Sequence, residues 1–454
     1  MRPTAPLLIA LSVSAAVTLT ACGDSGGDPD TVRLAYQRST DNKVRIMDDY
    51  LAGVQKEFER AHPGKKLKLV PIQAAQADYY TKLQQMMRSP KTAPDLVRED
   101  TFMIKSDITS GYLRPLDDKL AGWKDWSRFL PAAKAAARGE DGRTYGVPDG
   151  TDTRGLWFNK EIFAKAGLPA DWHPRTWQDV LDAARTVKRK VPGVIPLNVY
   201  TGKGPGEAAT MQGFEMLLYG TGPDPLYDPA AKKWVAGGQG FRDSLDFVRT
   251  VYGEKLGPDP SDALDPNIGT RVATEWLPGG RLAIALDGSW LGQNWLPTGG
   301  KPWPRWSEVM GRTAFPTRTG AAPGRVSLSG GWTWSITAKS ARADLAWELV
   351  ETLQTRANAV EWNVRDAEIA VRDDVAADPR YRSSMPGVGF FTGLVADTRY
   401  RPALPVYPQV SGAIREAMEA VTTGDATAAE AARRYDEQLT SIVGGASGVT
   451  VRDR

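Results

Sequence analysis

Cysteine and histidine are almost absent from this sequence. Its 454 residues contain one Cys and two His, which excludes an internal disulfide framework and a Cys-rich zinc site. His62 and His173 each precede a proline, and we interpret both as loop residues rather than as catalytic bases. Neither the GxxxxGK[ST] nor the GxGxxG spacing that wraps a phosphate is present. We therefore predict no metal site and no cofactor.

An excess of charge of one sign is also lacking. The chain has 57 Lys and Arg against 54 Asp and Glu, a formal net charge of +3, without a basic stripe. Nucleic acid is therefore not an expected partner. Charged residues make up 24% and hydrophobic residues 41% of the chain, which is the ordinary mixture of a globular protein. The length favours two or three domains.

The longest apolar run lies at the N-terminus. Residues 7–21 form a run of 15 that follows Arg2 and ends at Cys22. The run is shorter than the ~20 residues of a transmembrane helix, and its charged start and small-residue end are typical of a secretory signal. We predict an exported protein in which residues 1–21 are a signal peptide and residues 22–30 are a flexible polar tether.

Strand and helix patterns alternate along the first hundred residues. Apolar residues alternate with polar ones at 32–36 and 67–72, and helical spacing runs through 46–58 and 80–87 before a strand at 95–99. Further helices are predicted after Thr176, after Ser340, over 414–421 and after Thr427. The alternation predicts α/β layers with a largely parallel sheet, whose ligand sites lie beyond the carboxyl ends of the strands.

Aromatic residues are abundant, with 15 Trp, 14 Tyr and 11 Phe. Seven of the tryptophans fall in one region: Trp276, Trp290, Trp295, Trp303, Trp306, Trp332 and Trp334. A Trp suits a cleft in which the apolar face of a sugar stacks, although most Trp side chains simply pack in a core. Trp332 stands out because it follows Gly330-Gly331, where the backbone can approach a ligand closely.

The acidic residues leave an enzymatic alternative open. Two facing Asp or Glu side chains can hydrolyse a glycosidic bond when one of them has a raised pKa, so a secreted carbohydrate-active enzyme, a glycosidase or a lyase, is the rival hypothesis. A receptor for phosphorylated, cationic or peptide ligands would instead need a conspicuous charged cluster in its cleft. The sequence reveals none.

Several short segments occur in a fixed order along the chain. They are residues 93–97, 111–117, 145–148, 155–160, 280–284, 288–290, 330–332 and 401–409. In this order they resemble the extracellular solute-binding proteins of bacterial sugar ABC importers, and the last segment is similar to an element of the trehalose/maltose-binding branch. The residues before Cys22 resemble the lipobox of bacterial lipoproteins, in which this Cys carries the lipid.

The resemblance implies an α/β periplasmic-binding-protein fold of two lobes, like that of maltodextrin-binding proteins, with hinge segments that cross between the lobes. The crossings are expected near residues 146–152, 284–287 and 359. One lobe would comprise 31–147 and 288–358, and the other 153–284 and 361–443. Residues 444–454 are expected to be a frayed tail.

The resemblance also implies a function without catalysis. A monomer held at the outer face of the membrane by lipidated Cys22 would capture a neutral di- or oligosaccharide between its lobes and deliver it to the permease subunits of an importer. Position by position, the implied ligand-binding residues are Asp100, Thr151, Asp152, Trp290, Gly331, Trp332, Arg372, Tyr79 and Tyr407.

These residues also have structural alternatives. Asp100 could be a helix N-cap, Asp152 a turn residue, and the two tyrosines core packing. The sequence departs from the family pattern where Ala370 replaces a usual proline, where Gly150 replaces an aromatic residue of some relatives, and in the loop 36–41. These departures leave the identity of the sugar open.

Overall fold

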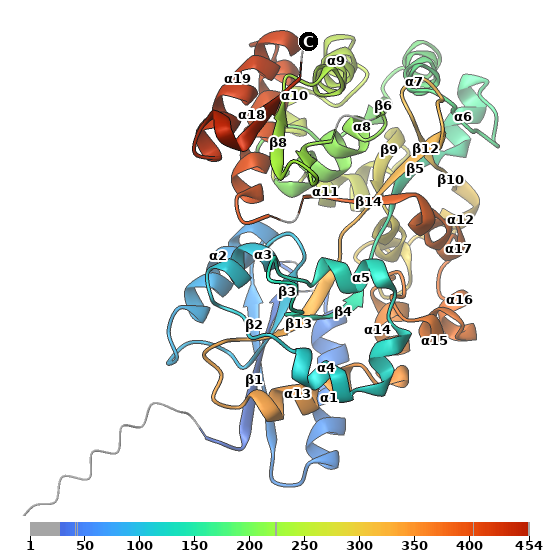
Figure 1. The fold of residues 1–454 in the computed structure, drawn as a ribbon. Coiled ribbons are helices and arrows are strands. Elements are labelled where there is room, and N and C mark those ends of the chain that lie inside the picture. The colour runs from blue at the N-terminus through green and yellow to red at the C-terminus, as the bar shows by residue number, and fades with distance from the viewer. Residues whose placement is uncertain (1–27, 41, 43, 223–224, 403, 453–454) are drawn as a thin grey trace, which may run out of the picture.

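The computed structural model describes residues 28–40, 42, 44–222, 225–402 and 404–452. The predicted signal peptide and Cys22 lie outside these ranges. The chain forms two lobes, each built around its own mixed sheet, which Figure 1 draws one above the other. Within the described ranges, we find no helix with the length and apolar character needed to cross a bilayer.

The first lobe contains a five-stranded sheet in the order β2-β1-β3-β13-β4. Its strands are β1 (Thr31–Arg38), β2 (Lys66–Gln73), β3 (Leu96–Asp100), β4 (Val147–Gly150) and β13 (Trp332–Ile336). β1 runs parallel to β2 and β3, whereas β13 runs antiparallel to β3 and β4. β3 is buried along its whole length, which carries the charged residues Arg98, Glu99 and Asp100 into the interior.

Helices cover both faces of this sheet. One apolar core joins the sheet to α1, α4, α5, α13 and α14, and another joins it to α2 and α3. The helices are α1 (Ile46–Ala61), α2 (Gln76–Met87), α3 (Ile104–Thr109), α4 (Asp117–Gly122), α5 (Pro131–Ala136), α13 (Ala343–Leu353) and α14 (Arg356–Arg365). In α1, Tyr50, Leu51, Val54 and Phe58 are buried, which is the spacing of one helical face.

The second lobe contains a four-stranded sheet in the order β10-β5-β9-β6. Its strands are β5 (Arg154–Asn159), β6 (Ile195–Asn198), β9 (Leu282–Gly288) and β10 (Met310–Thr313). β6 runs parallel to β9, and β5 runs antiparallel to both β9 and β10. One large apolar core holds this lobe together.

Most of the remaining elements belong to the second lobe. The helices are α6 (Lys160–Ala166), α7 (Trp177–Lys190), α8 (Met216–Leu218), α9 (Gln239–Gly253), α10 (Pro260–Ala263), α11 (Ile268–Arg271), α12 (Trp306–Val309), α17 (Val388–Gly393), α18 (Tyr407–Thr423) and α19 (Ala428–Ile442). Two small sheets join β11 (Phe315–Pro316), β12 (Arg325–Ser329) and β14 (Thr398–Tyr400), and β7 (Tyr227–Asp228), β8 (Lys233–Ala236) and β15 (Val449–Val451). Ala209–Glu215 and Val272–Trp276 are π-helical.

Two predicted crossings are wrong. Residues 289–329 were assigned to the first lobe, but β10 extends the sheet of the second lobe by pairing with β5, and Trp295 packs edge-on against Trp157 at 5.4 Å. The chain returns to the first lobe only at 330–331. α14 also stays with the first lobe, because Trp362 packs on Tyr50 of α1 at 5.1 Å.

The third crossing therefore comes later than residue 359. It follows α15 (Asp373–Ala376) and α16 (Pro379–Arg382), which pack on α14. The predicted frayed tail is also wrong for residues 449–451, because these residues form β15 and pair in parallel with Trp234–Ala236 of β8. Val449 is buried in the core of the second lobe, and this burial holds the segment in place.

Candidate functional site

Five of the predicted ligand-binding residues meet where the chain crosses between the lobes. Trp332 pairs with Asp100 on one side and with Gly150 on the other. The Thr151 hydroxyl donates to the carbonyl oxygen of Gly330 at 2.9 Å, and the Gly330 N–H donates to Asp152 Oδ1 at 2.7 Å. The first two crossing segments are thus bonded directly to each other.

Gly331 is required at this junction for a steric reason. Its φ is +127°, and a Cβ at this position would lie 2.5 Å from the carbonyl oxygen of Gly150. A side chain would therefore force the two crossing strands apart. The close approach leaves the Gly331 carbonyl oxygen as the acceptor for the Thr101 N–H at 3.1 Å.

Trp290 approaches the same junction from the second lobe. It follows β9, and the guanidinium of Arg154 lies 4.8 Å from the centre of its ring. Arg154 forms an ion pair with Asp152 and donates to the Leu328 carbonyl oxygen at 3.1 Å. Through Arg154, Trp290 and Asp152 therefore belong to one cluster.

Asp100 lies on the boundary between the two lobes. Its Oδ1 accepts from Arg401 Nη2 at 2.8 Å and from the Phe102 N–H at 2.7 Å, and its Oδ2 accepts from the Tyr80 hydroxyl and Gln76 Nε2. Arg401 also donates to Glu207 Oε1 at 3.2 Å. Because Asp100 ends β3 of the first lobe and Glu207 belongs to the second, Arg401 bridges the lobes.

The second lobe contributes two buried glutamates beneath Arg401. The Tyr407 hydroxyl donates to Glu207 at 3.0 Å and to Glu215 at 2.7 Å, and the Ser411 hydroxyl donates to Glu207 at 2.7 Å. Burial, followed by the negative charge of Glu207, raises the pKa of Glu215 to about 8. Glu215 ends the π-helical segment, a local geometry that is frequent at functional sites.

A second arginine, Arg98, forms ion pairs with three carboxylates of the first lobe. Arg98 donates to Asp149 at 2.8 Å, and its Nη2 lies 3.4 Å from Glu368 and 3.9 Å from Asp366. Its guanidinium lies 4.7 Å from the ring centres of both Trp332 and Trp362. This stacked arrangement is a cation–π sandwich that fixes the position of Trp332.

The other predicted residues have structural partners. Tyr79 is fully buried and donates to the Arg98 carbonyl oxygen at 2.5 Å, and its ring lies 6.0 Å from that of Trp332. Tyr407 is also fully buried, and the edge of its ring meets Phe102 across the lobe boundary at 5.7 Å. Both tyrosines are therefore buried residues that hold the neighbouring site residues in place.

Arg372 does not join this group. Its guanidinium pairs with Asp125 at 2.9 Å and with Asp374 at 2.8 Å, and it lies over the ring of Phe129. Arg372 also forms an isolated bridge with Phe129, so it is held inside the first lobe. The later crossing described above is the physical reason, because the segment before α15 remains on the first lobe.

The network of charged residues at the lobe junction was not predicted from the sequence. It contains Arg98, Arg154, Arg401, Glu207, Glu215, Asp366 and Glu368. The available signal was that Arg401 opens the segment 401–409, which already resembled a family element. Within the described ranges, we find no group of three or more His, Cys, Asp or Glu side chains arranged to hold a metal ion.

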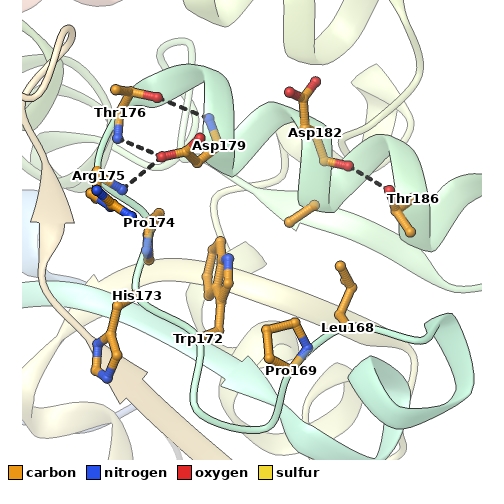
Figure 2. A pocket seen from close by; sticks show the side chains of 11 residues that line it. Leu168, Pro169, Trp172, His173, Pro174, Arg175, Thr176, Asp179, Asp182 and Thr186 are labelled. Atoms are coloured by element: carbon orange, nitrogen blue, oxygen red, sulfur yellow. Dashed lines mark hydrogen bonds between the residues drawn. The ribbon is translucent and has the colours of Figure 1, made fainter.

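A separate surface cavity of about 600 Å³ lies between the loop that connects α6 to α7 and one face of α7. Figure 2 shows Trp172 and Leu168 lining it and the hydrogen bonds of Thr176 with Asp179 at the start of α7. These bonds form a capping box that fixes the first turn of the helix. The polar groups at this end of the cavity are thus engaged in helix capping.

Comparison with known proteins identifies the family of this chain. The model of the family "Bacterial extracellular solute-binding protein" matches residues 44–360. The chain is 23% identical to a lactose-binding protein of Rhizobium radiobacter over 399 residues, covering 86% of this chain and 87% of the relative. It is 26% identical to an arabinooligosaccharide-binding protein of Bacillus subtilis (strain 168) over 153 residues, covering 33% of this chain and only 34% of that relative.

Solved structures share the fold. A solute-binding protein of Thermotoga lettingae bound with α-D-tagatose superposes with a TM-score of 0.77 at 22% identity, covering 91% of this chain and all of the other. The GacH receptor of Streptomyces glaucescens superposes with a TM-score of 0.75 at 23% identity, covering 91% and 98%. The predicted two-lobed α/β fold is therefore confirmed.

Proposed function

This chain belongs to the family of bacterial extracellular solute-binding proteins, and on that premise we propose that it is the substrate-binding component of an ABC importer for sugars. Its relatives include proteins named for binding lactose and arabinooligosaccharides. The protein works outside the cytoplasm, and its partners are the permease subunits of the importer. It acts as a monomer.

The proposed ligand is a di- or oligosaccharide bound at the lobe junction. The observation that carries this proposal is the meeting of Trp332, Trp290, Asp152 and Asp100 from different crossing segments and from both lobes. Tryptophan rings stack on the apolar faces of sugar rings, and carboxylates accept hydrogen bonds from hydroxyls. A ligand that contacts both lobes at once stabilises the closed form.

Within this site the residues have different proposed roles. Trp332 and Trp290 stack on the sugar, while Asp152, Thr151 and the backbone of Gly331 hold hydroxyl groups. Asp100 accepts a hydrogen bond from a sugar hydroxyl in exchange for one of its present donors. For Tyr79 and Tyr407 the contacts favour support of the site over direct binding. Arg372 is bound to Asp125 and Asp374 away from the site, and we assign it no role in binding.

We also propose that Cys22 carries a lipid that holds the protein at the membrane. The basis is the lipobox-like sequence before the only Cys of the chain. The described chain begins next to the first lobe, where Arg342 Nε donates to the carbonyl oxygen of Asp28 at 2.9 Å. A lipid at Cys22 would thus be tied to the first lobe by a tether of only a few residues.

The enzymatic alternative is not supported. The matching family consists of binding proteins rather than enzymes, and the buried glutamates Glu207 and Glu215 share one hydroxyl donor, Tyr407, within the second lobe. A glycosidase needs its two carboxylates on opposite sides of the scissile bond. We therefore assign no catalytic residue.

The test is a panel of mono-, di- and oligosaccharides measured by thermal shift and tryptophan fluorescence. A ligand that binds only the folded state raises the melting temperature in proportion to the logarithm of its concentration over Kd. We expect saturable binding of at least one sugar and a loss of at least 100-fold in affinity in Trp332→Ala, because stacking area is removed. Trp126→Ala, which removes a partly buried Trp of the first lobe that stacks on Trp123, is the control.

Two outcomes would contradict the proposal. If no sugar of the panel shifts a protein shown to be folded, the sugar-binding function is wrong. If sugars bind equally well to Trp332→Ala and to the wild type, the function stands but the site is elsewhere.

A further inference from the structure

The carboxylate of Glu368 lies over the backbone of Gly150 at the lobe junction. A Cβ at position 150 would lie 2.7 Å from Glu368 Cβ and 2.8 Å from its Oε2, so a larger residue there would displace the acid. Gly150 pairs with Trp332. The glycine that replaces an aromatic residue of some relatives therefore makes room for an acid beside the stacking tryptophan.

Glu368 belongs to a group with an excess of negative charge. Asp149, Asp366 and Glu368 share the single guanidinium of Arg98, and Asp152 adds its negative charge to the surroundings of Glu368. One cation therefore faces three carboxylates. The remaining charge must be balanced by a bound proton or by another cation.

The raised pKa values of two of these acids favour protons as the balancing charge. Burial, opposed by Arg98, raises the pKa of Asp366 to about 7. Burial and the negative charges of Asp366 and Asp149 raise the pKa of Glu368. A ligand with its own positive charge would release these protons and take their place.

Two further observations point to a ligand at this group. Asp149 is 97% buried, yet its Oδ1 has no hydrogen-bond partner while its Oδ2 holds Arg98. Glu368 and Asp366 keep 11% and 21% of their side chains exposed, and Trp332 is also only partly buried. Partly exposed acids next to a partly exposed indole ring are the groups that bind an ammonium ion.

We propose that the ligand of this site is an amino sugar, whose protonated amine binds Glu368 and Asp366 next to the ring of Trp332. This inference rests on the proposed sugar-binding function and narrows its ligand class. The neutral part of the sugar stacks as described above, and the ammonium replaces the protons of the acidic group. A sugar phosphate or a sugar acid carries no positive charge that could replace the protons of this group.

The experiment compares matched sugars by isothermal titration calorimetry. Each pair differs by the exchange of hydroxyl for amino: glucose and glucosamine, cellobiose and the glucosamine disaccharide, and trehalose and 2-amino-2-deoxytrehalose. We expect the amino member of at least one pair to bind at least tenfold more tightly at pH 6, with release of protons. The proton release is measured by repeating the titration in buffers with different ionisation enthalpies.

Two variants locate the effect. Glu368→Gln keeps the size and hydrogen-bonding groups of the protonated acid, so we expect it to fold and to reduce the amine preference to threefold or less. Glu361→Gln removes an acid of α14 whose side chain is 41% exposed and pairs with Arg365, and we expect it to keep the full preference. Melting temperatures within 2 °C of the wild type establish that both variants fold.

The outcomes separate this inference from the function on which it rests. Neutral sugars that bind as tightly as their amino partners, or an unchanged preference in a folded Glu368→Gln, would overturn the amino-sugar inference alone. An absence of binding by every sugar, neutral or amino, would overturn both.

Discussion

The bridge made by Arg401 between the lobes gives the most direct quantitative prediction. Arg401, Asp100 and Glu207 have side chains that are each less than 10% exposed. In Arg401→Met the apolar stem is kept, but two carboxylates lose their buried cation. Removal of one partner from a buried ion pair costs about 3–5 kcal/mol, because the remaining charge is left without compensation.

The size of the effect on melting follows from the length of the chain. An unfolding entropy of about 2.1 cal/mol/K per residue amounts to roughly 0.9 kcal/mol/K for about 430 residues, so the melting temperature should fall by about 3–6 °C. Arg325→Met is the matched control, because Arg325 pairs with Asp397 at 2.7 Å but is 52% exposed. An exposed pair contributes less than about 1 kcal/mol.

The dependence on pH makes the prediction specific. Burial raises the pKa of Glu207, and Arg401 counteracts that rise, so loss of Arg401 raises this pKa further. A buried acid with a raised pKa is tolerated below its unfolded pKa of about 4.5 and destabilises the fold as pH rises through its folded pKa. The deficit of Arg401→Met should therefore be larger at pH 8 than at pH 5.

The assay is differential scanning calorimetry of the wild type, Arg401→Met, Arg325→Met and the double variant Arg401→Met/Glu207→Gln. We expect the double variant to recover part of the loss, because it buries one fewer unpaired charge. Equal deficits for the two arginine variants, or a deficit that does not change between pH 5 and pH 8, would refute the reasoning.

Two other predictions concern Glu215 and Cys22. Burial raises the pKa of Glu215 to about 8, so the stability of the fold should decrease as pH rises from about 4.5 to 8. In thermal melts Glu215→Gln should equal the wild type at pH 5 and exceed its stability by on the order of 4 kcal/mol at pH 9. Parallel pH curves of the two proteins would contradict this. Cys22→Ser should move the protein from the membrane fraction to the soluble fraction on cell fractionation without changing its melting temperature, and an unchanged distribution would contradict lipid anchoring.

Local patterns in the sequence predicted much of the secondary structure. Thr176 and the Thr427 capping box begin α7 and α19 as expected, and the structure adds a capping box at Thr176, because capping depends on residues three positions apart. The apolar spacing of α1 also predicted its buried face. The family resemblance supplied the two-lobed arrangement, which no local pattern contains.

Assignments that depend on contacts between distant residues were less accurate. An apolar pattern at Trp295 and Trp306 indicates burial but not the core in which the residue is buried, so their segment was given to the wrong lobe. The residues 97–100, Val-Arg-Glu-Asp, predict the end of a strand, yet this strand is central and its charged residues are interior. Their partners Arg401, Asp149 and Glu368 lie elsewhere in the sequence, and only the folded chain brings them together.

The position of β13 in the first sheet has a consequence for the export of the chain. β13 separates β3 from β4, and its Trp332 pairs with Asp100, 232 residues earlier. The first lobe therefore lacks an internal strand until most of the polypeptide has been delivered, and contacts between such distant residues form slowly. For a chain that crosses a membrane in unfolded form, this order of assembly would delay the folding of the N-terminal half until the rest has followed.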